Sequence, residues 1–95
     1  MHARVILGRV KLDKRDEAIG IFKEIVMPAI KAQKGFKSIN LLTDPDSSKF
    51  ISITIWETEK DMLAGESSGY LQQQLGKLSA LFVGPPTIQH FIVAV

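Results

Sequence analysis

The chain has 95 residues, of which 45% are hydrophobic, and a formal net charge of +2. This length supports one domain, residues 1–95, with one core. The chain has no cysteine, which excludes disulfides and thiolate chemistry. The one basic cluster, Lys31, Lys34 and Lys37, falls near a predicted helix end without interleaved aromatic residues, so nucleic-acid binding is not expected. No signal peptide or membrane span is recognisable, so we expect a cytoplasmic protein without a membrane partner.

The first predicted elements are a strand and a helix. Residues 3–10 are rich in β-branched residues and predict a strand, in which Gly8 indicates a bulge or a close backbone approach. Asp13 is the predicted N-cap of a helix with one broad apolar face. Gly35 follows the last periodic residue as a predicted left-handed C-cap. Pro28 lies inside this helix, where it removes a hydrogen bond, so we expect a kink or a break just before it.

Two further strands are predicted at residues 36–43 and 49–57, joined by a turn at residues 44–48. The second of them alternates most clearly, so its side chains divide between two faces. One face carries Ile51, Ile53 and Ile55, and the other carries Phe50, Ser52, Thr54 and Trp56. Both faces hold apolar groups, so we expect one to contact helices and the other to contact a second sheet.

The last third of the chain predicts a broken helix and a final strand. Thr58 and Asp61 resemble a capping box that starts a short helix at Glu59, and residues 67–69 interrupt it. A second helix is expected from Tyr70 to Phe82, with residues 72–74 off its apolar stripe. The sequence Gly-Pro-Pro then ends the helix, and residues 87–95 form the last strand.

This βαββαβ order predicts an α+β fold with a four-stranded antiparallel sheet and helices on one face. The bare face of the sheet would be apolar. Packing two such faces together buries them, which predicts a homodimer with a shared barrel-like core.

Three segments of the chain resemble the antibiotic biosynthesis monooxygenase (ABM) domain family. They are MPAIKAQKGFKSINLL, KFISITIWETEKDM and SSGYLQQQLGKLSALFVGPP, which together with the connecting residues cover nearly the whole chain. The resemblance implies a ferredoxin-like subunit in a dimeric α+β barrel. The family includes quinone-forming monooxygenases, haem-degrading enzymes and members of unknown activity.

The same resemblance argues against haem. Haem degraders of this family use an Asn, a Trp and a His, and the corresponding positions here are Leu7 or Gly8, Gly65 and Leu75. Cofactor-independent oxygenation of anthrone-like phenols needs only substrate binding and proton removal, so no cofactor is expected. A metal site is not expected either, because the acidic residues lie in a turn and at a helix start.

Six residues are candidates for a ligand site. Trp56 is either a corner anchor or a ring that stacks on substrate. His90 alternates with apolar neighbours and is either a satisfied interior histidine or a base. Tyr70 is either an exposed helix-start residue or a cavity gate. Asn40 shares a pocket with Ser52, Thr54 and Trp56 in one hairpin register, and faces the isoleucines if the register slips by one residue.

Two functions of different class are compatible with these residues. One is a cofactor-independent monooxygenase that acts on a small aromatic or quinol-like metabolite. The other is a non-catalytic dimer that binds a small apolar ligand or has another role. A ligand site is expected between sheet and helices near Trp56, because the helix interruption at residues 67–69 leaves room there.

Overall fold

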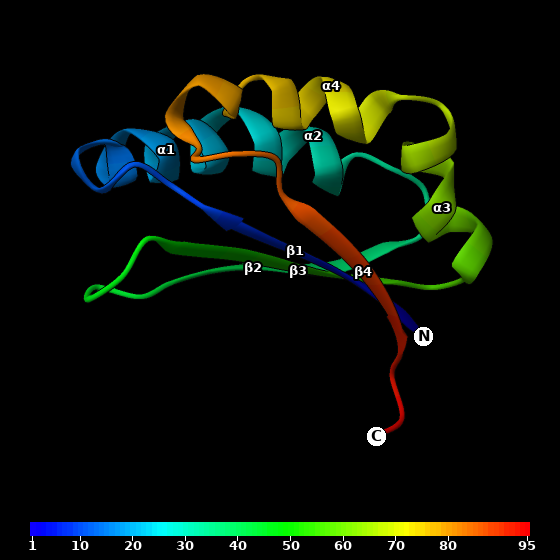
Figure 1. The fold of residues 1–95 in the computed structure, drawn as a ribbon. Helices are drawn as coiled ribbons and strands as arrows, with labels where there is room; N and C mark the ends of the chain where they lie inside the picture. The colour runs from blue at the N-terminus through cyan, green and yellow to red at the C-terminus, as the bar shows by residue number, and fades with distance from the viewer.

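The computed structural model describes residues 1–95 as a two-layer molecule, a sheet covered on one side by helices (Figure 1). The elements in chain order are β1 (His2–Arg9), a 3-10 turn (Leu12–Lys14), α1 (Arg15–Ile21), a π-helical segment (Phe22–Val26), α2 (Met27–Lys31), β2 (Phe36–Thr43), β3 (Lys49–Trp56), α3 (Glu59–Ser67), α4 (Tyr70–Gly76), a second 3-10 turn (Ser79–Leu81) and β4 (Thr87–Ile92). No helix is long and apolar enough to cross a membrane.

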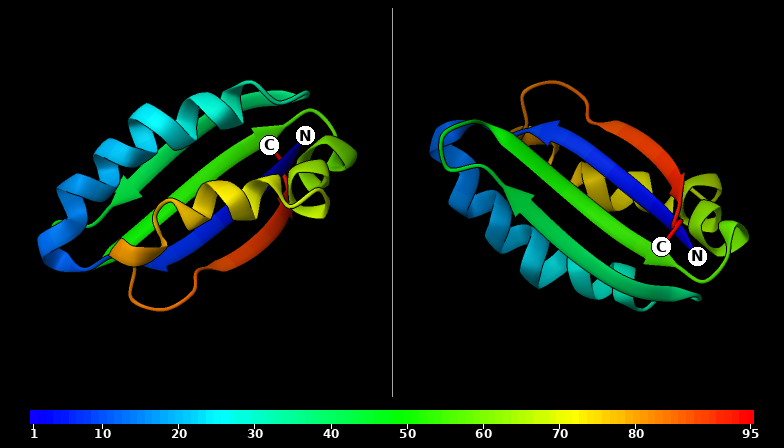
Figure 2. Two further views of the ribbon diagram at one scale, coloured as in Figure 1. Left: turned by 90° about the horizontal axis from the view of Figure 1, so that it is seen from above. Right: turned by 90° about the horizontal axis from the view of Figure 1, so that it is seen from below.

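The sheet is antiparallel throughout, with the strand order β2-β3-β1-β4. All helices lie on one of its faces, and the opposite face is uncovered when the molecule is viewed from below (Figure 2). This arrangement confirms the predicted α+β, ferredoxin-like fold. The chain ends run side by side at one end of the sheet, where β4 stops at Ile92, three residues earlier than expected.

The first helix is continuous from Arg15 to Lys31 but changes its hydrogen-bonding pattern on the way. The expected irregularity before Pro28 is present as the π-helical segment Phe22–Val26, so the helix is neither interrupted nor ended there. Pro28 sits in the first turn of α2, where its missing N–H is tolerated. Gly35 has the predicted left-handed conformation, with φ of 82°.

The predicted N-cap of this helix was wrong. Asp13 lies within the 3-10 turn, and the N-cap position of α1 is Lys14, which makes no side-chain capping hydrogen bond. The 3-10 turn delays the start of the α-helix by closing i to i+3 bonds first. Asp16 and Glu17 still place negative charge in the first turn, where the helix dipole favours it.

The helix-facing side of β3 forms the centre of the core. Phe50, Ser52, Thr54 and Trp56 are all buried on this side, whereas the three isoleucines between them are only partly buried. Phe22 from the first helix packs edge-on against Phe50, with ring centroids 6.1 Å apart. The alternation predicted for this strand is thereby confirmed, and the phenylalanine–tryptophan side is the one that meets the helices.

The second helical region follows the predicted break. Thr58 caps α3 by accepting a hydrogen bond from the Asp61 N–H at 3.1 Å, and Gly69 separates α3 from α4 with φ of 81°. However, α4 ends at Gly76 and gives way to a 3-10 turn before Phe82, so the expected helix is shorter. Gln74 was expected to lie off the apolar stripe but is only 3% exposed, because it lies three residues from Leu71 on the buried side of α4.

The uncovered face of the sheet is apolar. Val5, Leu7, Ile51, Ile53 and Ile55 lie on it and are partly buried by one another. Leu42 and Phe91 flank them on the outer strands and are about half exposed. A face of this composition is suited to contact with another apolar surface.

Candidate functional site

The hairpin register separates the predicted polar residues. A β-bulge between Phe36 and Ser38 shifts β2, so Asn40 pairs with Ile53 and points to the uncovered face. Ile39 and Leu41 are therefore the neighbours of Thr54 and Ser52 on the helix side. Of the two registers that the sequence allowed, the molecule has the one in which Asn40 meets the isoleucines.

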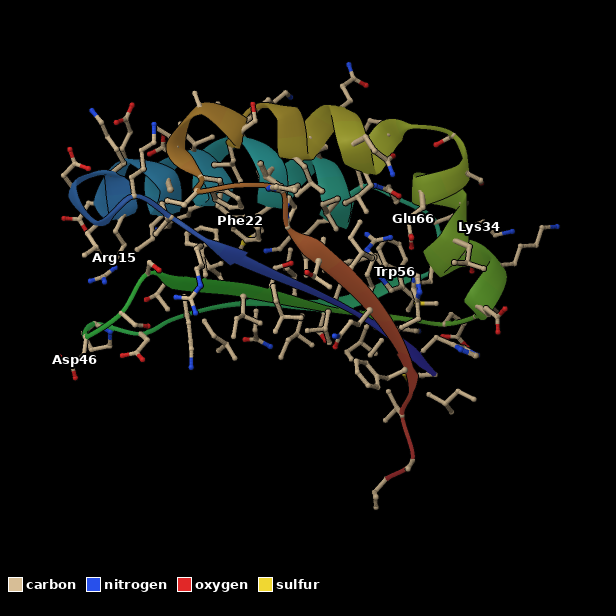
Figure 3. The ribbon with its side chains drawn as sticks, in the orientation of Figure 1. Arg15, Phe22, Lys34, Asp46, Trp56 and Glu66 are labelled. Atoms are coloured by element: carbon tan, nitrogen blue, oxygen red, sulfur yellow. The ribbon has the colours of Figure 1, made fainter.

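Trp56 is fully buried at the end of the sheet under α3 (Figure 3). Its indole Nε1–H donates to Thr54 Oγ1 at 2.8 Å, which satisfies the polar atom of the ring. Phe36 packs edge-on against it, with centroids 6.0 Å apart, and the Arg4 guanidinium lies 5.1 Å from the ring centroid. These contacts give Trp56 the surroundings of a corner anchor, and Trp56 lines none of the five main hollows of the molecule.

Arg4 is a candidate site residue that the sequence does not single out. It is 1% exposed on the helix side of β1 and donates from Nη1 to the Met62 carbonyl at 2.8 Å. The same nitrogen lies 3.5 Å from Glu66 Oε2, whereas Arg4 Nε is buried without a partner. Burial lowers the pKa of Arg4, and the Glu66 carboxylate opposes that shift. The signal available was the alternation of β1, which places Arg4 on the same face as buried Ile6.

Glu66 connects Arg4 to the predicted candidate His90. His90 Nε2 lies 2.8 Å from Glu66 Oε2 and 3.0 Å from Oε1, and its side chain is 40% exposed. His90 also stands opposite Arg4 in the β1–β4 ladder. Trp56, Thr54, Arg4, Glu66 and His90 are thus linked in one polar cluster at this end of the sheet.

Two hollows border β4. The smaller, of about 270 Å³, is next to the polar cluster and is lined by His2, Glu59, Met62, Leu63, His90, Phe91 and Ile92. The larger, of about 470 Å³, lies between α4 and the loop before β4. Its lining is Gln72, Leu75, Gly76, Ser79, Phe82, Gly84, Pro85, Pro86 and Ile88. Ile88 and His90 share a face of β4 about 7 Å apart, so the hollows are neighbours.

The space between sheet and helices is otherwise nearly full. A void of about 10 Å³ remains beside Ser52, lined by Leu, Ile and Phe side chains, two of which, Leu75 and Phe82, also line the larger hollow. Tyr70 lies apart from these two hollows and lines an open hollow of about 630 Å³ between α2 and α3. Ser52 is therefore near the β4 hollows, whereas Asn40 and Tyr70 are not.

The positions that correspond to the haem-degrading residues do not fit haem. Leu75 packs against the core and has no metal-binding imidazole, and Gly65 has no side chain. His90 is engaged by Glu66. Haem degradation is not expected from this arrangement.

The fold, the uncovered sheet face and the hollows beneath the helices define a ferredoxin-like α+β protein with room for a small ligand. The family model of the antibiotic biosynthesis monooxygenases matches residues 1–74, and the chain belongs to this family.

The chain is similar to known proteins at low sequence identity. The uncharacterised protein Rv2557 of Mycobacterium tuberculosis is 27% identical over 94 residues, and the match covers 99% of this chain but 41% of that protein. The monooxygenase of the gene ActVA-Orf6 from Streptomyces coelicolor, solved with nanaomycin D, superposes with a TM-score of 0.82 at 18% identity, over 99% of this chain and 88% of its own. SnoaB of Streptomyces nogalater, a cofactor-independent oxygenase, superposes with a TM-score of 0.81 at 17% identity. The match covers 99% of this chain and 93% of the SnoaB chain.

Proposed function

We propose that this chain is a cofactor-independent monooxygenase that acts on a small aromatic, quinol-like metabolite. The observation that carries the proposal is the 470 Å³ hollow between α4 and the β4 loop. Its volume falls within the range of about 300–1,000 Å³ that is typical of small-molecule sites. Membership of the monooxygenase family and the likeness to two oxygenases support the same reading.

The lining of the hollow suits a flat, mostly apolar ligand. Leu75, Phe82 and Ile88 offer apolar surface, and Gln72 and Ser79 offer polar groups at the edge. Leu75 and Phe82 also separate the hollow from the void beside Ser52. A shift of these two side chains would extend the site toward the sheet.

The chemistry needs no resident redox group because the substrate itself reduces O₂. For an anthrone-like substrate, a base first removes a proton to give an electron-rich enolate. One oxygen atom of O₂ then becomes the new carbonyl oxygen, and the other leaves as water with the two hydrogens of the former CH₂ group. The protein has to bind the ring, exclude bulk water and accept a proton.

We further propose that the active form is a homodimer through the uncovered sheet face. Five aliphatic side chains lie together there, with Leu42 and Phe91 half exposed beside them. Burying this apolar surface provides gross stabilisation of about 25 cal/mol per Å², from which the entropy of association is subtracted. The same sheet face of a second copy of the chain provides a complementary apolar surface.

The alternative function, a non-catalytic dimer that binds a small apolar ligand, is favoured by one observation. The interior next to Ser52 is filled by Leu, Ile and Phe side chains rather than lined by polar groups. The two functions differ in turnover and not in binding, so both quantities have to be measured.

Gly76 offers a direct test of the hollow. It lines the hollow, and a Cβ built on it meets no atom within 4 Å, so Gly76→Phe places a ring in the space without a clash near the backbone. We expect this substitution to weaken binding of a naphthoquinone by about tenfold or more, and to reduce anthrone oxidation in proportion. Gly20 in α1 is the matched control, because it also has open space at its Cβ but lies outside the hollow. Equal binding and turnover in Gly76→Phe and Gly20→Phe would refute this location, whereas binding without turnover in the unmodified protein would select the non-catalytic function.

A further inference from the structure

Glu66 holds a buried cation on one side and a half-exposed histidine on the other. Arg4 is 1% exposed and sits 3.5 Å from Glu66 Oε2. A buried guanidinium needs a counter-charge, because leaving it unpaired in a poorly solvated interior is costly. Arg4 is in turn fixed by the Met62 carbonyl and by the face of Trp56, so the carboxylate of Glu66 has a defined position.

This carboxylate determines which ring nitrogen of His90 carries the proton. An ionised carboxylate only accepts hydrogen bonds, so the contact at 2.8 Å requires His90 Nε2 to be the N–H donor. In the neutral ring the lone pair is then on Nδ1. Nδ1 makes no hydrogen bond within the chain. A histidine oriented by a carboxylate, with its other nitrogen free, has the arrangement of a general base.

The ring of His90 lines the smaller hollow together with apolar side chains from α3 and β4. Charged and titratable groups that face this region are Arg4 and His2 from β1 and Glu59 and Glu66 from α3. The volume of about 270 Å³ is just below the range of drug-sized ligand sites, which begins at about 300 Å³, and suits one aromatic ring. Ile88, which lines the larger hollow, is two residues from His90 on the same face of β4, so the two hollows are neighbours along this strand.

We propose that His90 accepts the phenolic proton of the substrate at Nδ1, and that Glu66, held by Arg4, is the positioning residue for this step. The proposal rests on the proposed function and names its base. In the step, the substrate O–H bond breaks and an N–H bond forms at Nδ1; for an anthrone this O–H is the hydroxyl of its enol tautomer, and loss of its proton gives the enolate that reacts with O₂. The products are a phenolate and an imidazolium, whose charge the Glu66 carboxylate balances. No oxidant takes part.

The competing interpretation is that the His90–Glu66 contact only ties β4 to α3. The two interpretations differ in what happens to a bound phenol. Para-nitrophenol is a suitable probe because its phenolate absorbs visible light and its neutral form does not. The titration is done at a pH where the free probe is mostly protonated, with bound probe measured separately by equilibrium dialysis.

We expect bound probe to show the phenolate band with the unmodified protein. His90→Gln should lower the phenolate fraction of bound probe by about tenfold. Glu66→Gln should lower it as well, and long-range nitrogen–proton NMR should show that His90 no longer favours the Nε2–H tautomer. Glu17→Gln is the matched control, since it removes another ion-paired carboxylate, 3.7 Å from Lys14, that lies in α1 and does not line the smaller hollow, and it should leave the band unchanged.

Glu66→Gln leaves Arg4 without its counter-charge and is the variant at risk of unfolding. Circular dichroism checks this, and His90→Gln carries the test in that case because it leaves the Arg4–Glu66 pair intact. An undiminished phenolate band in His90→Gln, or no binding of the probe at millimolar concentration, would overturn the proposal. Ionisation of the probe without any oxygen uptake on anthrones would leave His90 as a base and reject the oxygenase function, so the two failures are distinguishable.

Discussion

Phe82 lies against the backbone of Gly8 so closely that a Cβ at residue 8 would be 2.9 Å from the ring carbon Cε2. Phe82 also packs edge-on against Phe50, with centroids 5.3 Å apart, and lines the larger hollow. Gly8 therefore fixes the position of one wall of the proposed site. The glycine makes a close approach, as one of the two sequence-based alternatives predicted, and β1 pairs with both neighbours without a bulge.

Gly8→Ala should displace the Phe82 ring and lower the free energy of unfolding by about 1–3 kcal/mol, since overpacking forces side chains from their preferred positions. Urea denaturation followed by circular dichroism measures this. The double variant Gly8→Ala with Phe82→Leu should lose less unfolding free energy than the two single variants together, because the smaller side chain at residue 82 relieves the contact. Strict additivity would show that the two residues do not interact as described.

Trp56→Phe should lower the free energy of unfolding by about 1–3 kcal/mol while leaving the fold and the dimer intact. The phenylalanine ring lacks the Nε1–H that Thr54 accepts, and it fills less of a fully buried site. Thr54→Val removes the acceptor and keeps the shape. In a double-mutant cycle the two changes should couple by about 1 kcal/mol, and zero coupling would contradict the hydrogen bond.

The proposed dimer predicts a mass of two chains in sedimentation equilibrium at micromolar concentration. Ile53 lies on the uncovered face, opposite both Val5 and Asn40 in the ladders, so Ile53→Glu should give monomers by placing a charge in the interface. Ile25→Glu is the control, because Ile25 is 46% exposed on the helical side. A monomer in the unmodified protein, or dimers in both variants, would argue against association through this face.

Asp44 should account for part of the loss of folding stability at acidic pH. Its carboxylate accepts hydrogen bonds from the Asp46 N–H and the Ser47 hydroxyl, and the first of these is the main cause that lowers the pKa of Asp44. A carboxyl whose pKa is lower in the folded state binds fewer protons there than in the unfolded chain. Its stabilisation is therefore present above the ordinary carboxyl pKa and is lost as the pH falls through the folded-state value.

At neutral pH, Asp44→Asn should therefore have a lower free energy of unfolding than the unmodified protein. This difference should shrink as the pH falls below the usual carboxyl range. Urea titrations at several pH values measure it, with Asp46→Asn as a charge-matched control in the same turn. A difference that is independent of pH would show that the hydrogen bonds, and not the charge of Asp44, determine the effect.

Local patterns were enough to predict most of the fold. The alternation of Phe50 and Trp56 with the isoleucines located the core face of β3, and Thr58 and Gly69 marked the start and end of α3. These signals are short-range properties of the backbone and of side-chain direction. The π-helical turn before Pro28 was foreseen as an irregularity but not as a π-helix, because its geometry depends on how the helix packs on the sheet.

The site was less predictable because it depends on long-range pairing. A bulge between Phe36 and Ser38 places Asn40 on the other face, and the sequence around it does not distinguish the two registers. Arg4 and Glu66 lie 62 positions apart, and only the folded chain brings β1 beneath α3. His90 could be recognised as a residue on an apolar face, but its partner could not.

The most direct test of the proposed function is oxygen uptake by purified protein with dithranol, an anthrone, after dialysis against chelator and without flavin. The account predicts uptake above the spontaneous rate, one O₂ consumed for each anthraquinone formed, and incorporation of one atom of isotope-labelled O₂ into the product. Gly76→Phe should reduce the rate and Gly20→Phe should not. A rate equal to spontaneous oxidation, with the ligand nevertheless bound, would contradict the oxygenase function and leave a binding protein of the same fold.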